Sequence, residues 1–117
     1  MVEGVARIRY LRTSFKKSKR ICEAIRGKTA KEALDTLYFL TKKPAKLLYK
    51  AVKSACNSWA IKKGIKFDDV DFNNLMVKVC KVDKGSTWRI LRPGFRGAPR
   101  IARRHTAHFT VVVEEVK

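Results

Sequence analysis

The sequence predicts an α+β fold in which three helices pack on a small antiparallel sheet and a long β-hairpin protrudes from it. Apolar residues recur at helical spacing as far as Gly64 and alternate with polar residues beyond it. The segment 87–106 then folds back on itself at a loop rich in proline and glycine. A chain of 117 residues is expected to form one domain, 1–117, with the extended hairpin at about 84–107.

The N-terminal region predicts a strand followed by a basic helix. A strand over residues 5–11 would direct Arg7 and Arg9 away from Ile8 and Tyr10. Ser14 is expected to cap a helix over 14–26, because its hydroxyl can accept a hydrogen bond from an unpaired amide. The glycine that follows this helix supplies a left-handed stop. The apolar stripe of the helix is Ile21, Cys22 and Ile25, and cations cover much of its remaining surface.

Two more helices follow, each with a recognisable start. Thr29 with Glu32 three residues later forms a capping box. Pro44 suits the first turn of the next helix, which is expected to stop at Gly64. The apolar stripe of the second helix is Ala33, Leu34, Leu37 and Tyr38. The third helix buries Leu48, Ala51, Val52, Ala55 and Trp59, whose spacing is typical of a core-facing helix.

The C-terminal half predicts strands. Alternation over 75–82 places Leu75, Val77 and Val79 on one face of a strand, and Met76, Lys78, Cys80 and Val82 on the other. A bend or bulge is expected at 83–86, an extended segment at 87–91 and a loop at 93–99. A long final strand over 101–113 turns Phe109, Val111 and Val113 to one side.

The net charge of +18 indicates a polyanionic partner. It arises from 28 Lys and Arg against 10 Asp and Glu, in a chain that is still 45% hydrophobic. Enough apolar mass remains for a core, so disorder is disfavoured, and nucleic acid is the abundant polyanion that would offset the charge. No apolar run approaches the length of a membrane span, and no signal peptide is expected at the N-terminus. Three widely spaced cysteines predict free thiols in a reducing compartment rather than a disulfide scaffold.

The distal hairpin cannot be explained by a core. Two arms of about nine residues would reach on the order of 30 Å, and no helix remains to cover them. An isolated two-stranded hairpin is marginally stable in water, so an external partner must stabilise it. From residue 84 to residue 113 there is no acid, and six of the seven basic residues are arginine, whose planar fork suits phosphates and bases. Trp88 and Phe95 could add stacking on unpaired bases.

Six ordered sequence blocks carry a family resemblance. They are IRGK at 25–28, EAL at 32–34, KSA at 53–55, NNL at 73–75, VDKG at 82–85 and RRHTAHFTVVV at 103–113. Over residues 5–115 the chain resembles the large-subunit ribosomal protein L twenty-two family. It departs from the family pattern at Phe15, where many members have proline, and at Gly94 and Ala98, where arginine is common.

The resemblance implies a structural constituent of the large ribosomal subunit, in a bacterial cytoplasmic or an organellar ribosome, that aids subunit assembly. The implied partners are large-subunit rRNA, neighbouring ribosomal proteins and, at the hairpin tip, the nascent polypeptide in the exit tunnel. No catalytic residue, cofactor, metal or membrane partner is expected. The candidate rRNA-binding residues are Arg7, Arg9, Lys16, Lys17, Lys19, Arg20, Arg26, Lys28, Arg89, Arg92, Arg96, Arg100, Arg103, Arg104 and His108. The candidate tunnel-lining tip is Gly94, Phe95, Arg96, Gly97, Ala98 and Pro99.

Parts of the sequence also suggest two other functions. An architectural DNA-binding protein could insert a basic β-arm with proline at its tip into a minor groove. An enzyme is disfavoured: His105 and His108 would face opposite sides of a strand, so they and Cys80 make a poor metal site. A solvated turn is a better interpretation of Asp68, Asp69 and Asp71 than a metal-dependent nuclease site, because the sequence offers no complete set of catalytic groups.

Overall fold

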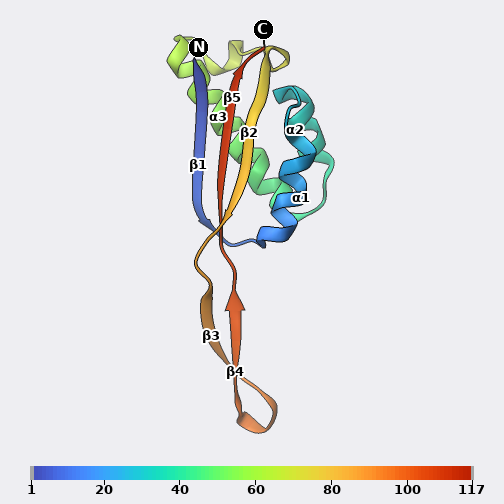
Figure 1. Ribbon diagram of the computed structural model, residues 1–117, viewed down its shortest axis with the longest axis vertical. Helices are drawn as coiled ribbons and strands as arrows, with labels where there is room; N and C mark the ends of the chain where they lie inside the picture. Colours follow the sequence, from blue (N-terminus) through green and yellow to red (C-terminus); the bar gives the residue numbers. More distant parts are fainter. Residues whose placement is uncertain (1, 117) are drawn as a thin grey trace.

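A computed structural model describes residues 2–116 and has two parts, a helix-covered sheet and a projecting hairpin (Figure 1). The sheet is antiparallel with the order β1-β5-β2, and the hairpin is a separate two-stranded sheet, β3-β4. The strands are β1 (Glu3–Leu11), β2 (Leu75–Lys84), β3 (Trp88–Pro93), β4 (Pro99–Arg104) and β5 (Ala107–Glu115). The helices are α1 (Phe15–Ile25), α2 (Ala30–Phe39) and α3 (Lys43–Lys63). The predicted α+β fold is confirmed.

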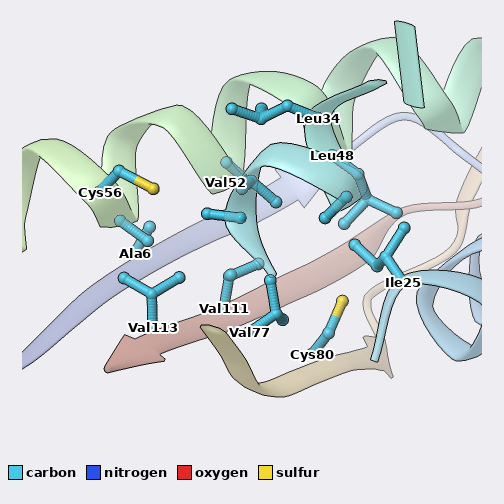
Figure 2. Close-up of a cluster of buried hydrophobic side chains, with 14 of the residues drawn as sticks. Ala6, Ile25, Leu34, Leu48, Val52, Cys56, Val77, Cys80, Val111 and Val113 are labelled. Atoms are coloured by element: carbon cyan, nitrogen blue, oxygen red, sulfur yellow. The ribbon is translucent and has the colours of Figure 1, made fainter. Parts of the chain in front are cut away.

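All three helices cover the same face of the sheet, so the opposite face is open to solvent (Figure 1). Helix α3 packs on β1 and β5, α1 packs on β2, and α2 lies against α3. Figure 2 shows the resulting core, in which Leu48 and Val52 of α3 face Val77, Val111 and Val113 of the sheet. None of the helices in the described part of the chain combines the length and apolar character needed to cross a membrane.

The predicted core stripes are buried with one exception. Tyr38 was expected to complete the stripe of α2, but it is 72% exposed. Helix α2 buries its small and aliphatic residues up to Leu37, and the Tyr38 ring lies instead beside Tyr49 and Phe39 on the surface. The three cysteines are buried and free, and burial raises the pKa of the Cys56 thiol to about 12.

The two predicted helix caps differ in outcome. The Thr29 hydroxyl accepts a hydrogen bond from the Glu32 amide, as the capping box predicts. Ser14 is the N-cap residue of α1, as predicted, but the expected hydrogen bond to its hydroxyl is absent. The Ser14 carbonyl accepts hydrogen bonds from both the amide and the hydroxyl of Ser18, so the serine contributes through its backbone. Gly64 ends α3 at φ 74°, in the left-handed region where it was expected.

Thr29→Ala is expected to lower the free energy of unfolding by about 1 kcal/mol, because one amide of the first turn of α2 loses its acceptor. Chemical denaturation measures the change. Ser14→Ala is the matched control, since its hydroxyl caps no amide, and it should leave stability nearly unchanged. Equal losses in the two variants would contradict the assignment of the cap to Thr29.

A β-bulge changes the predicted faces of β2. Val77 pairs with Val113 and Val79 pairs with Val112, so Lys78 is an extra residue in the ladder. Beyond the bulge the alternation reverses, which buries Cys80 and leaves Val79 half-exposed on the open face. The prediction that grouped Val79 with Leu75 and Val77 is therefore wrong, because one inserted residue exchanges the faces of all that follow.

The long final strand predicted over 101–113 is broken at residues 105–106. There the two connecting segments cross between the body and the hairpin (Figure 1). The Gly85 amide donates to the Thr106 carbonyl at 2.9 Å, and the Thr106 hydroxyl donates to the Ser86 carbonyl at 2.6 Å. Gly85 has no room for a side chain, because a Cβ there would overlap the Thr106 hydroxyl oxygen, which is held by its hydrogen bond to Ser86. The hairpin thus emerges from a narrow, hydrogen-bonded neck.

Candidate nucleic-acid interface

The hairpin gives the molecule its length. The longest principal extent is 62 Å, against 24 and 21 Å in the other directions, and the radius of gyration is 17.2 Å. A compact chain of this length would have a radius of gyration of about 13 Å. All the residues of β3 are exposed, and residues of β4 are exposed or half-exposed. The hairpin therefore presents both of its faces to a surrounding partner.

Each face of the hairpin mixes arginine with apolar side chains. The register places Arg92 opposite Arg100 on one face and Arg89 opposite Arg103 on the other. Like charges directly opposite one another destabilise a strand pair unless an anion lies between them. The first face also carries Trp88, Ile90, Ala102 and Arg104, and the second carries Leu91, Pro93, Pro99 and Ile101. A partner that stabilises this hairpin must therefore offer both anions and apolar ring surfaces to each face. A nucleic acid offers both, in its phosphates and its bases.

Arg104 differs from the other hairpin arginines. It is half-buried at the base of the hairpin opposite Trp88. Its Nε atom is buried and has no hydrogen-bond partner among the residues that the structure describes. A buried donor without an acceptor is energetically unfavourable, so the base of the hairpin also lacks a hydrogen-bond acceptor that a partner could provide.

The tip of the hairpin is a single 3-10 turn, Phe95–Gly97. The Gly94 amide donates to the Ala98 carbonyl at 2.6 Å and closes the loop. Arg96 and Gly97 both have positive φ values, 53° and 76°. The Arg96 guanidinium lies 5.3 Å from the centre of the Phe95 ring, which is 76% exposed. The tip therefore presents an aromatic ring and a cation together at the far end of the molecule.

The basic face of α1 forms a second cationic surface. Lys16, Lys17, Lys19 and Arg20 are all exposed along it. Lys17 and Arg20 line a cavity of about 460 Å³ together with Lys42 and Lys43, which precede and begin α3. The sequence interpretation missed these two lysines, because only the packing of α1 beside the start of α3 brings them to the same place.

Arg26 and Lys28 lie where α1 meets β2. The Arg26 guanidinium donates to the Cys80 carbonyl through Nη2 at 2.8 Å and Nε at 3.3 Å. The Lys28 carbonyl accepts a hydrogen bond from the Val77 amide, while the Lys28 side chain is exposed. Arg26 thus also has a structural part, holding the end of α1 on the sheet.

The open face of the sheet carries a third group of cations. Arg7 and Arg9 of β1 are exposed on it, as predicted, and Lys81 of β2 joins them through the bulge. Tyr10 was expected beside Ile8 on the opposite face, but it has a φ of 58° at an irregularity in β1 and is 57% exposed. His108 accepts a hydrogen bond from the Tyr10 amide through Nδ1 at 3.0 Å.

The ion pairs of the described chain gather at the opposite end of this sheet. Lys78 donates to Glu3 at 2.7 Å and lies 3.5 Å from Glu114, and Lys63 lies 3.5 Å from Glu115. The hydrogen bond from Lys78 lowers the pKa of the Glu3 carboxyl. Within residues 2–116, no carboxylate forms an ion pair with the cations of the hairpin, of α1 or of the hairpin end of the sheet. These three surfaces are left charged toward solvent.

Comparison with known proteins identifies the family. The model of the family described as "Ribosomal protein L22p/L17e" matches residues 6–114, which span the sheet, the helices and the hairpin. The chain belongs to the ribosomal protein L22p/L17e family. The family resemblance drawn from the ordered sequence blocks is therefore confirmed.

The relatives of this L22p/L17e chain are similar along their whole length. It is 38% identical to "Large ribosomal subunit protein uL22" of Myxococcus xanthus over 117 residues, covering 99% of each chain. The protein of the same name from Maridesulfovibrio salexigens is 36% identical, covering 98% of this chain and 100% of the relative. That of Bdellovibrio bacteriovorus is 34% identical, covering 97% and 99%.

Membership of the L22p/L17e family makes the chain a ribosomal protein, which is a structural class rather than an enzymatic one. It favours the ribosomal interpretation over the architectural DNA-binding one. The predicted rRNA-binding residues do not form one site. Most of them divide among the hairpin, the α1 face and the open sheet face, and Arg26 and Lys28 lie where α1 meets β2. Their individual roles in an L22p/L17e protein stay predictions.

Proposed function

We propose that the chain is a structural component of the large subunit of the bacterial ribosome and acts there as a single rRNA-binding domain. Its bacterial relatives favour the cytoplasmic ribosome of a bacterium over an organellar ribosome. The proposed rRNA contacts are those named from the sequence. They lie on the basic face of α1, at the junction of α1 with β2, on the open face of the sheet, and on both faces and the tip of the hairpin. Contacts of this kind fix position through phosphates, and specificity comes from the folded shape of the rRNA.

The observation that carries this proposal is the hairpin register. Each face of the hairpin carries one pair of arginines that lie directly opposite each other across the two strands. The side chains of Leu91 and Ile101 are exposed beside them. Such a hairpin is unfavourable in water on both counts, because like charges repel and apolar surface is solvated. Insertion between rRNA segments places phosphates against the guanidinium groups and covers the apolar side chains. The body would remain at the subunit surface while the hairpin runs inward.

We further propose that the tip, residues 94–99, lines the nascent-peptide exit tunnel. It is the part of the molecule farthest from the helix-covered body (Figure 1). Phe95 and Arg96 are exposed there and offer an apolar ring and a cation to a passing peptide. Because the hairpin and the body would hold separate rRNA segments together, the protein would also aid subunit assembly.

A photo-crosslinking amino acid in place of Phe95 is expected to label nascent peptide in translating ribosomes. Phe39 is the matched control, because it is equally exposed, at 79%, but lies on the body. A probe there should not label the peptide. Tunnel placement would be wrong if the Phe95 probe failed to label nascent chains in purified translating ribosomes while bulk aqueous reagents reached it.

A further inference from the structure

The open face of the sheet carries a cleft that the hairpin contacts do not explain. It has a volume of about 350 Å³ and is lined by Arg7, Arg9, Tyr10, Lys81, Asp83 and His108, among others. We propose that this cleft binds one unpaired RNA nucleotide, with its base stacked on Tyr10 and its phosphates held by the three cations. The inference rests on the proposed rRNA-binding function and names a specific subsite within it.

Tyr10 is held in an unfavourable backbone conformation that fixes its ring at the cleft. Its φ of 58° lies in the left-handed region, which costs a residue with a side chain roughly 1 kcal/mol or more. A hydrogen bond from its amide to His108 Nδ1 stabilises this conformation. The two rings meet edge to face with centroids 4.8 Å apart. The phenol ring is therefore fixed in place while more than half of the residue stays exposed, ready to stack on a base.

The polar groups of the cleft match a nucleotide better than a simple anion. Because His108 Nδ1 accepts a hydrogen bond, the proton of its neutral imidazole lies on Nε2, which is then a donor. Asp83 pairs with His108 across the strands and adds a carboxylate to an otherwise cationic cleft. A carboxylate disfavours a bare phosphate or sulfate, but it accepts hydrogen bonds from an amino group of a base or from a 2′-hydroxyl.

The charge and the size of the cleft agree with this occupant. Within residues 2–116, Arg7, Arg9 and Lys81 form no ion pair, so their charge is available to phosphates. The volume of about 350 Å³ falls in the range of about 300–1,000 Å³ that is typical of small-ligand sites. A base in a duplex is stacked on its neighbours and cannot reach the Tyr10 ring, so the nucleotide must be unpaired.

The test compares Tyr10→Gly with Tyr10→Phe in binding to deproteinised large-subunit rRNA. Glycine accepts the left-handed backbone and removes the ring, while phenylalanine keeps the ring. Tyr10→Gly is expected to weaken binding about tenfold with an unchanged salt dependence, because stacking is lost but no charge is. Tyr10→Phe should bind like the parent chain. Lys81→Gln should reduce the slope of log affinity against log salt by about 1. Thermal unfolding of each variant verifies the fold.

The outcomes separate this inference from the proposed function. Parent-like binding by Tyr10→Gly, alongside weakened binding by a hairpin-arginine variant, would overturn the nucleotide cleft and leave rRNA binding intact. Equal weakening by Tyr10→Gly and Tyr10→Phe would overturn the stacking role. Parent-like binding by every variant, hairpin included, would overturn both proposals. Ultraviolet crosslinking provides a direct readout: Tyr10 should join an unpaired nucleotide, and a crosslink to a paired one would contradict the inference.

Discussion

Replacing Arg89, Arg92, Arg100 and Arg103 with glutamine is expected to lower the affinity for large-subunit rRNA by about 10³-fold at 0.1 M salt. Each lost phosphate contact removes roughly 0.7–0.9 from the slope of log affinity against log salt, which is about five- to eightfold in affinity at that salt concentration. Four contacts together therefore approach three decades. The slope itself should fall by about 3 to 4.

The hairpin register pairs these four arginines directly, Arg89 with Arg103 and Arg92 with Arg100. Their removal also relieves like-charge repulsion, so the free protein should be at least as stable as before, and a loss of binding would not reflect unfolding. Filter binding across a salt series measures the affinity and its slope. The control removes four exposed lysines of the body instead, Lys31, Lys46, Lys50 and Lys66. If both variants lost the same slope, binding would depend on net charge alone and the hairpin would have no special part.

Gly4→Ala is expected to destabilise the protein by about 3 kcal/mol, a large share of the roughly 5–15 kcal/mol typical of a domain. Strand β1 crosses α3 at this point without space for a side chain. A Cβ on Gly4 would overlap the Ala55 carbonyl oxygen and would lie 2.7 Å from the Trp59 Cβ and 2.8 Å from the Trp59 amide nitrogen. These are atoms on and beside the helix backbone, so relief requires that α3 move away from the sheet.

Gly64→Ala is the control for the Gly4 variant. Gly64 has a φ of 74°, and an added Cβ would meet nothing within 4 Å. The expected loss is about 1 kcal/mol, from backbone conformation alone. Chemical denaturation of both variants measures the difference. A Gly4→Ala variant no less stable than Gly64→Ala would show that β1 and α3 can separate without loss of packing.

Local patterns were sufficient for most of the architecture. Thr29, Pro44 and Gly64 each mark a helix boundary by a local mechanism, and the structure has the helices there. The apolar stripe of α3 predicted its buried face, because a helix repeats its faces regardless of what it packs against. The hairpin was predicted from its proline and glycine loop and from the lack of any element left to cover it. The division of charge into a basic helix and an arginine-rich hairpin was also visible along the chain.

The misassigned residues lie where one strand must fit another. At Lys78, one extra residue exchanges the faces of β2, so Cys80 is buried and Lys81 joins the open face. At Tyr10, an irregularity in β1 turns the ring onto His108, a partner 98 residues away in sequence. The local alternation of apolar and polar residues does not predict either irregularity, because each is set by pairing with β5.

The sequence alone determined that this protein has an α+β fold and that an arginine-rich hairpin extends from it, and its net charge indicated a polyanionic partner. These properties follow from periodicity, turn chemistry and the distribution of charge, all of which are local to the chain. Tertiary structure decided which cations share a surface. It brought Lys42 and Lys43 beside α1, placed arginine opposite arginine in the hairpin and assembled the cleft around Tyr10. Those arrangements depend on strand register and helix packing. Both are fixed by contacts between residues that are distant in the sequence, so local patterns do not predict them.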